Sequence, residues 1–254
     1  MKRIVGILGC GVIGNALRVW LEKNTEHTIL INDPFKGFHD NLSESDVIFV
    51  NIHIPTDENG KQEIAPLNEI IKNLPNKPIF IRTTVLPGTS DCLSKEFGKD
   101  VNFLPEFLTE RTAVTDFQEQ PMVFTSHIDI LKDVFKGKKY IEMSSYEAEL
   151  GKYAHNVFGA LKVTFFNAIC DMTEKYGADF QKVRQAALLS GYINEMHTNV
   201  PGPDGAYGYG GKCFPKDTNA FAMFTKDLPI GKLLENLACV NENFRAKLAI
   251  AHGE

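Results

Sequence analysis

The first 33 residues constrain the fold more strongly than any other part of the chain. An apolar run at residues 3–8 leads into Gly9-Cys10-Gly11-Val12-Ile13-Gly14, and a helical pattern of apolar residues follows as far as Leu21. Glycines at this spacing let the backbone turn tightly, approach a phosphate closely and pack the helix on the strand. The helix N-terminus then offers unpaired N–H groups to an anion. The pattern predicts a dinucleotide-binding turn, with these residues against the cofactor: Gly9, Gly11, Val12, Ile13 and Gly14.

An acidic residue stands where such a turn needs one. Asp33 comes nineteen residues after Gly14, just past a second expected strand at Thr28–Ile31. A carboxylate at this place binds the adenosine ribose hydroxyls and repels a 2′-phosphate, which predicts NAD rather than NADP as the cofactor. The alternative is that Asp33 only begins the turn that continues at Pro34. Cys10, in the variable position of the loop, is expected to be a small filler.

The rest of the first half continues in short β-rich runs separated by helical or loop segments. This alternation predicts an α/β fold, an N-terminal doubly wound (Rossmann) parallel sheet with helices on both faces, over residues 1–145. Further strands are expected at Asp46–Ile52, Ile79–Thr83, Asn102–Leu104, Met122–Thr125 and Lys139–Met143.

After Ser145 the pattern becomes helical. An apolar stripe runs along one long helix at residues 146–176: Leu150, Tyr153, Ala154, Val157, Phe158, Leu161 and Phe165. Further helices are expected at about 179–190, 215–226 and 229–248, so that residues 146–254 form an all-α domain on a long central helix. The stripe, with Phe166, offers more apolar surface than such a domain should leave exposed, which predicts a homodimer. The loop at 191–213 is long enough to be expected to be functional.

Composition excludes several classes of protein. The net charge of −5 argues against a nucleic-acid binder. The expected long helix carries too many charged residues to span a membrane, and the N-terminus has no signal-peptide pattern. Five scattered cysteines, with no C-x-x-C pair, indicate neither a disulfide framework nor a metal site, which fits a cytoplasmic protein. Cys92, Cys170 and Cys239 are expected to be buried structural cysteines.

Cys213 has a different setting. It follows the glycine-rich stretch 205–211 and precedes Pro215, which fits the first turn of a helix. A helix N-terminus and the flanking Lys212 and Lys216 favour a thiolate, so the pKa of Cys213 is expected below the free value of about 8.5. Cys213 is therefore the candidate nucleophile.

Lys152 and Asn156 lie one turn apart on the expected long helix. A lysine beside an apolar stripe is usually a surface residue whose stem covers apolar atoms. From spacing alone, Lys152 receives no role.

Taken together, the chain resembles the UDP-glucose / GDP-mannose 6-dehydrogenase family over nearly its whole length. The resemblance rests on five segments in the family's order: Gly9–Gly14 with Asp33, Thr83–Thr89, Pro105–Glu110, Glu149-x-x-Lys152-x-x-x-Asn156, and Tyr209–Asp217. The segment around Cys213 is highly specific, whereas the first loop is shared by many dehydrogenases.

The resemblance implies an NAD-dependent four-electron oxidation of the primary alcohol of a nucleotide sugar to the uronic acid. It implies Cys213 as the nucleophile, with Lys152, Asn156 and Asp217 as its polar network. Thr84 and Glu106 would position or activate water, and Thr84 would also contact the cofactor. The substrate site would be lined by Glu106, Phe107, Leu108, Glu110, Lys152, Asn156, Tyr209 and Gly210.

The chain departs from the family in two respects. Members usually continue through a third, nucleotide-capping α/β domain, for which the 254 residues have no counterpart. Members also usually carry an arginine shortly before the glycine-rich loop that reaches the sugar across a dimer interface. The corresponding stretch here, residues 190–194, contains none.

Two other functions remain open at this stage. One is a two-electron dehydrogenase of a small β-hydroxy acid, which would not need Cys213. The other is a non-catalytic NAD-binding homologue, against which the joint presence of Cys213, Lys152, Asn156 and Asp217 argues.

Overall fold

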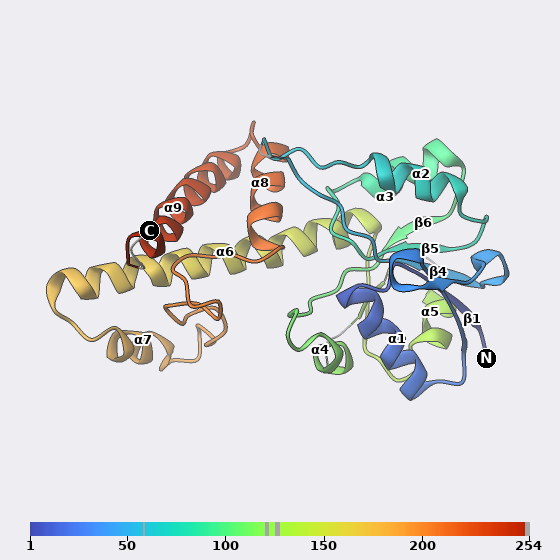
Figure 1. Cartoon of the computed structure of the whole chain (residues 1–254), viewed down its shortest axis with the longest axis horizontal. Coiled ribbons are helices and arrows are strands. Elements are labelled where there is room, and N and C mark those ends of the chain that lie inside the picture. Colours follow the sequence, from blue (N-terminus) through green and yellow to red (C-terminus); the bar gives the residue numbers. More distant parts are fainter. Residues whose placement is uncertain (58, 120–121, 125–127, 252–254) are drawn as a thin grey trace. The chain divides into compact units, whose positions relative to one another are not determined.

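The computed structural model describes residues 1–57, 59–119, 122–124 and 128–251, and its contacts divide the chain into two compact units (Figure 1). The first unit comprises Met1–Pro55 and Gln62–Lys152. The second comprises Thr56–Lys61 and Tyr153–Glu254.

A six-stranded sheet with the order β3-β2-β1-β4-β5-β6 forms the centre of the first unit. Neighbouring strands pair in parallel, except that β3 runs antiparallel to β2. The predicted doubly wound α/β fold is confirmed, although β3 was not predicted. The strands are β1 (Ile4–Leu8), β2 (Thr28–Asp33), β3 (Phe38–His39), β4 (Val47–Val50), β5 (Ile79–Ile81) and β6 (Val101–Phe103).

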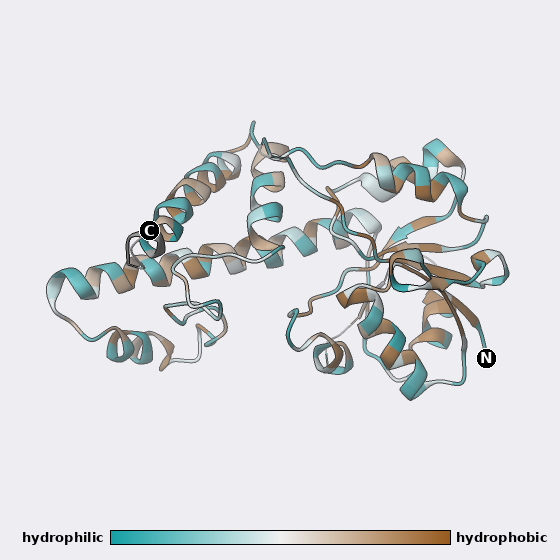
Figure 2. Cartoon of the chain, viewed as in Figure 1, coloured by the Kyte–Doolittle hydropathy of each residue, from teal (hydrophilic) through white to brown (hydrophobic). Residues whose placement is uncertain are grey.

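Helices cover both faces of this sheet, with α2 and α3 on one face and α1, α4 and α5 on the other (Figure 1). Strand β4 contributes side chains to the apolar cores on both faces of the sheet. Val47 and Phe49 pack under α1, whereas Ile48 and Val50 pack under α2, because successive side chains of a strand point to opposite faces. Figure 2 shows the resulting apolar strands beside helices of mixed character. The helices are α1 (Val12–Asn24), α2 (Ala65–Asn73), α3 (Thr89–Phe97), α4 (Ala113–Glu119) and α5 (Ile128–Val134), with short 3₁₀ turns η1 (Pro34–Lys36) and η2 (Leu42–Glu44).

Two predicted strands do not extend the large sheet. Within the described residues, β7 (Met122–Phe124) and β8 (Tyr140–Glu142) pair in parallel with each other as a separate two-stranded sheet. Ile141 and Glu142 are exposed, so β8 lacks the two apolar faces that an inner parallel strand needs. Thr125, the predicted end of the first of these strands, lies outside the described residues.

The second unit is helical, as predicted. Helix α6 (Ser145–Tyr176) begins in the first unit and belongs to the second from Tyr153 onward. Tyr153 stacks on Phe221 of α8 with ring centroids 4.9 Å apart, and α8 packs along α9. The remaining helices are α7 (Phe180–Leu188), α8 (Phe214–Phe224) and α9 (Pro229–Ala251).

The buried face of α6 differs from the predicted apolar stripe. Tyr153 and Val157 are buried, whereas Phe158 and Phe165 are 66% and 57% exposed, and Phe166, which the homodimer prediction also counted as exposed, is 2% exposed. The helix instead buries a row of polar side chains that spacing rules assign to the surface: Lys152, Asn156, Thr164 and Asn167. The sequence did not indicate this buried polar row, because apolar periodicity marks a helix but does not say which face meets a partner that is itself polar.

Candidate active site

The glycine-rich turn has the geometry that its sequence predicts. Gly9 has φ +82°, and a Cβ there would lie 2.7 Å from the carbonyl oxygen of Asn51. A Cβ on Gly14 would lie 2.0 Å from the carbonyl oxygen of Gly9, so this glycine is required for the helix to pack. Gly11 has no atom within 4 Å of its Cβ position. The open space at Gly11 fits a ligand that lies against the backbone.

Asp33 faces this turn. Its Oδ2 accepts a hydrogen bond of 2.7 Å from the backbone N–H of Cys10. Asp33 also precedes the 3₁₀ turn at Pro34–Lys36, but its side chain makes no capping bond to that turn. The carboxylate is therefore held beside the glycine-rich loop, where a ribose contact is possible, rather than used by the turn. Cys10 is buried, as expected of a small filler.

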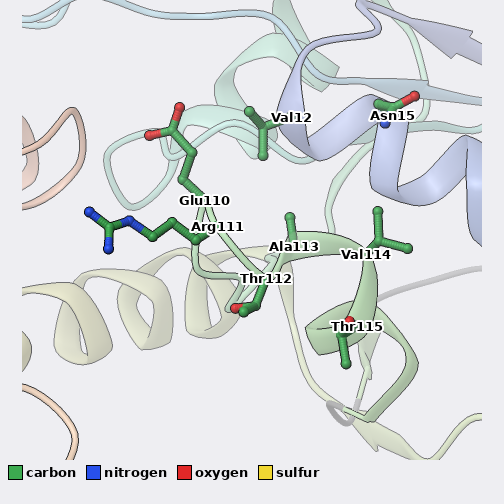
Figure 3. A pocket seen from close by; sticks show the side chains of 8 residues that line it. All are labelled: Val12, Asn15, Glu110, Arg111, Thr112, Ala113, Val114 and Thr115. Carbon is green, nitrogen blue, oxygen red and sulfur yellow. The ribbon is translucent and has the colours of Figure 1, made fainter. Parts of the chain in front are cut away.

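A cavity of about 260 Å³ opens beside the first turn of α1 (Figure 3). Val12 and Asn15 line it from α1, and the segment Glu110–Thr115 lines it from the other side. Val12 was predicted to bind the cofactor and Glu110 the substrate, so the structure places one residue of each kind on the same cavity. Arg111 was missed. The only signal for it in the sequence is a cation directly after the Pro105–Glu110 segment.

Lys152 and Glu106 form a buried ion pair within the first unit. The Nζ of Lys152 donates to the carbonyl oxygen of Glu106 and, over 3.0 Å, to its Oε1. The Lys152 and Glu106 side chains are only 4% and 7% exposed. The Oε2 of Glu106 accepts from the N–H of Leu108 at 2.7 Å, and Lys152 lies over the ring of Phe107. The interpretation of Lys152 as a surface residue was wrong, because the partner that draws it inward is 46 residues away in sequence.

Thr84 lies in a buried loop that Gln62 holds. The Nε2 of Gln62 donates to the carbonyl oxygen of Thr84 at 3.2 Å, and its Oε1 accepts from the N–H of Leu86 at 3.1 Å. Gln62 has no distinguishing motif, so the sequence offered no signal for this role.

Arg82 is a second buried cation that the sequence did not reveal. Its Nη1 donates to the carbonyl oxygen of Ile13 at 3.5 Å and to Oδ1 of Asn51 at 3.4 Å, and its guanidinium lies 5.1 Å from the ring centre of Phe117. Burial lowers the pKa of Arg82 to about 10, although the negative charge of Glu106 acts to raise it. The group therefore remains charged at neutral pH beneath the start of α1.

Asn156 and Asp217 are brought together in the second unit. The Nδ2 of Asn156 donates to Oδ2 of Asp217 at 2.7 Å, and Lys216 pairs with Oδ1 of the same carboxylate. Asn156 is 4% exposed and Asp217 is 1% exposed. Since the N–H of Asp217 also donates to the carbonyl oxygen of Cys213, this buried pair is joined to the first turn of α8.

Cys213 is the N-cap residue of α8 and is exposed. The ring of the next residue, Phe214, packs so closely on α6 that a Cβ at Gly159 would lie 2.5 Å from it. Cys170 is buried as expected. The same expectation for Cys92 and Cys239 was wrong, because both side chains are on the exposed sides of α3 and α9.

Two buried asparagines hold the backbone of the glycine-rich loop before Cys213. Asn167 Oδ1 accepts from the N–H of Gly208 at 2.9 Å. Asn241 accepts from the N–H of Tyr209 at 2.6 Å and donates to its carbonyl oxygen at 3.0 Å. Burial also raises the pKa of Tyr209 to about 12. A Cβ on Gly210 would lie 2.9 Å from the guanidinium of Arg245.

The predicted site residues thus fall into two groups. Thr84, Glu106, Phe107, Leu108, Glu110 and Lys152 belong to the first unit with the glycine-rich turn, and Asn156, Tyr209, Gly210, Cys213 and Asp217 belong to the second. Over the part of the chain that the structure describes, no cluster of three or more His, Cys, Asp or Glu side chains could hold a metal ion. A helix able to cross a membrane is likewise missing from those residues.

Comparison with known proteins shows which family the chain is similar to. Residues 146–243 match the model of the UDP-glucose/GDP-mannose dehydrogenase family, central domain. UDP-glucose 6-dehydrogenase of Rhizobium meliloti is 31% identical over 230 residues, which cover 80% of this chain and 51% of that protein. GDP-mannose 6-dehydrogenase of Pseudomonas aeruginosa is 28% identical over 214 residues, which cover 74% of this chain and 48% of that protein. The chain spans about half the length of the curated relatives it matches.

Among solved structures, a UDP-glucose dehydrogenase from the archaeon Pyrobaculum islandicum superposes with a TM-score of 0.80 at 23% identity. The match covers 96% of this chain and 68% of that one. At this identity the likeness concerns the fold.

Proposed function

We propose that this chain catalyses the NAD-dependent four-electron oxidation of a nucleotide sugar. It belongs to the UDP-glucose/GDP-mannose dehydrogenase family, because residues 146–243 match the central domain and the homology covers about 80% of its length. The primary alcohol would become the carboxylate of a uronic acid, with two NAD reduced and one water consumed per molecule.

The observation that carries this proposal is the setting of Cys213. An exposed thiol stands at the N-cap position of α8, one turn before a buried carboxylate, Asp217, that accepts a hydrogen bond from Asn156. The partial positive charge of a helix N-terminus favours the thiolate. A dehydrogenase that stopped at the aldehyde would not need a nucleophile there, whereas oxidation to an acid is made easier by a covalent intermediate.

The first unit fits NAD. Gly11 leaves the space that a diphosphate needs at the N-terminus of α1, and Asp33 is held beside it for the ribose. Thr84 would complete the cofactor site. Bound NAD would supply the hydride acceptor for both oxidations.

We assign the remaining steps to side chains of this chain. The Cys213 thiolate forms a C–S bond to the aldehyde carbon, and the carbonyl oxygen becomes an alkoxide. Lys152 and Asn156 stabilise this oxygen, since donors aimed at developing charge contribute about 3 kcal/mol each. After the second oxidation the thioester is attacked by water, for which Glu106 is the base and Thr84 a positioning group. Acid and thiol are released.

Residues of the segment Phe107–Glu110 would contact the substrate. Glu110 lines the cavity beside α1, and Phe107 and Leu108 belong to the adjoining segment. Gly210 would contribute its backbone. Tyr209 would shape the loop, because its ring is 3% exposed and its N–H and carbonyl groups are both bonded to Asn241.

The decisive experiment counts NADH per acid formed across a panel of UDP- and GDP-sugars. We expect two NADH per acid for one of these sugars. Cys213→Ser should abolish net turnover or stop it at the aldehyde while NAD binding remains. Cys92→Ser and Cys239→Ser are matched controls, because these thiols are also exposed, and both should keep wild-type turnover. One NADH per turnover, with Cys213→Ser fully active, would instead support a two-electron dehydrogenase.

We also propose a homodimer through the second unit. Phe158 and Phe165 expose large aromatic side chains on α6, more than an isolated helical unit usually leaves to water. Light scattering at micromolar concentration should give twice the chain mass. A monomer would contradict this part of the proposal.

A further inference from the structure

Glu149 is a buried carboxylate of α6 to which neither the motifs nor the proposed mechanism gives a task. Its side chain is 0% exposed. Its Oε2 accepts from the N–H of Gly88 at 2.6 Å, and its Oε1 accepts from the N–H of Ser90 at 2.9 Å and from the Ser90 hydroxyl at 2.7 Å. All these contacts lie within the first unit.

The three hydrogen bonds act on the start of α3. This helix has Gly88 as its N-cap, which has no side chain to satisfy the first backbone N–H groups. Glu149 takes the place of the missing cap from another helix. Burial raises the pKa of Glu149, while the bonds from Ser90 and Gly88 oppose that rise. Since every one of these partners is a donor and the N-terminus of α3 attracts negative charge, the ionised carboxylate matches its surroundings.

The position of Glu149 on α6 links two parts of the candidate site. The loop runs from Thr84 to Gly88. Gln62 binds its first residue and Glu149 binds its last, so the two side chains fix both ends of the loop. Three residues further along the same helix, Lys152 holds Glu106. One turn of α6 therefore binds both the Thr84 loop and the Glu106 segment.

We propose that Glu149 is a positioning residue that fixes the position of the Thr84–Ser90 loop relative to Lys152 and Glu106. Thr84 and Glu106 touch cofactor or water in the proposed reaction, and Glu149 acts only through them. The effect on turnover rests on the proposed function, but the effect on the loop and on NAD binding does not.

The test compares Glu149→Gln and Ser90→Ala with Glu147→Gln. Glutamine keeps the size of the side chain but loses the charge and presents an N–H₂ group to backbone donors. Ser90→Ala removes one bond of three and leaves the charge, so it remains informative where Glu149→Gln fails to fold. Glu147 is the matched control, because it accepts two bonds from Ser144 on the exposed side of the same helix.

Amide exchange, NAD affinity and steady-state kinetics are measured for each variant. We expect faster exchange in residues 84–97 and weaker NAD binding for Glu149→Gln, with the same changes, smaller, for Ser90→Ala. Misplacing reacting groups by about 1 Å lowers rates by about a hundredfold, so kcat should fall by about ten- to a hundredfold while alkylation of Cys213, in the second unit, keeps its wild-type rate. Glu147→Gln should match wild type throughout.

The outcomes separate a positioning role from a structural one. A helix cap alone would lower the urea midpoint of Ser90→Ala and leave its kcat and NAD affinity unchanged, which would overturn the proposal. Unchanged exchange at 84–97 in Glu149→Gln would overturn it as well. If wild type oxidises no sugar nucleotide, the proposed function fails, while the exchange and NAD-affinity results still decide the role of Glu149.

Discussion

Replacing Glu106 by Gln tests the central ion pair of the first unit. The pair has an N–O distance of 3.0 Å and side chains that are 4% and 7% exposed, so neither charge can be solvated if the other is removed. At an effective dielectric constant of about 20, opposite charges at this distance attract by about 5 kcal/mol. Breaking a buried pair by removing one partner costs about 3–5 kcal/mol, because the remaining charge stays buried.

This cost predicts a large shift in a urea titration. With an m-value of about 2 kcal/mol per molar, 4 kcal/mol lowers the midpoint by about 2 M. Trp20 provides the signal, because it is the one tryptophan of the sequence and packs in the core of the first unit against Phe117 and Phe135. Its fluorescence therefore reports the unit that contains the ion pair.

A double variant distinguishes lost pairing from general damage. Glu106→Gln with Lys152→Met removes the stranded ammonium, so its midpoint should lie above that of Glu106→Gln alone, while turnover stays abolished in both. Glu110→Gln, an exposed carboxylate of the same segment, is the control and should keep the wild-type midpoint. An unchanged midpoint for Glu106→Gln, or a double variant less stable than either single variant, would refute the reasoning.

Three further predictions concern the glycine-rich turn, its acid and one histidine. Gly14→Ala should lower the urea midpoint, because its Cβ would lie 2.0 Å from the Gly9 carbonyl oxygen. Gly11→Ala should keep the wild-type midpoint and weaken NAD binding. Equal effects of the two variants in both assays would contradict this prediction. Asp33→Ala should narrow the preference for NAD over NADP in kcat/KM, and a wild type equally efficient with both would count against the ribose contact. Burial and neighbouring positive groups lower the pKa of His197 in the folded protein. Just below the pKa of about 6.5 that histidine has in the unfolded chain, only the unfolded state takes up a proton, so the free energy of unfolding falls as the pH falls. His197→Asn, which tolerates the observed φ of +64°, should reduce this loss between about pH 7 and 5 in urea titrations followed by helical circular dichroism, and an unchanged pH slope would show that His197 does not contribute.

The parts of the fold that depend on local pattern could be predicted from the sequence. The first strand, the glycine turn and the first helix were expected where they occur, because each depends on neighbouring residues. Strands β7 and β8 were expected in the large sheet, since a short β-rich run shows no sign of the strand with which it pairs. The burial of Asn156 was missed for the same reason: periodicity marks a helix but not the partner of each face.

The candidate site shows the same division. Cys213 could be placed at a helix N-terminus because Pro215 and the preceding glycines are close in sequence. Lys152 looked like a surface lysine, and Glu149 and Arg82 received no role. Their hydrogen-bond partners are 31 or more residues away in sequence, so no spacing rule could connect them. Long-range pairing of polar side chains was what the sequence alone could not show.

Gly159 has a consequence for how this chain can change over evolution. A glycine inside a helix is less favourable than alanine by about 1 kcal/mol, so selection for stability alone would replace it. The ring of Phe214, beside Cys213, occupies the space that a Cβ would need. The two positions are therefore expected to covary: relatives with a larger residue at 159 should carry a smaller one at 214, and relatives that keep the phenylalanine should keep the glycine.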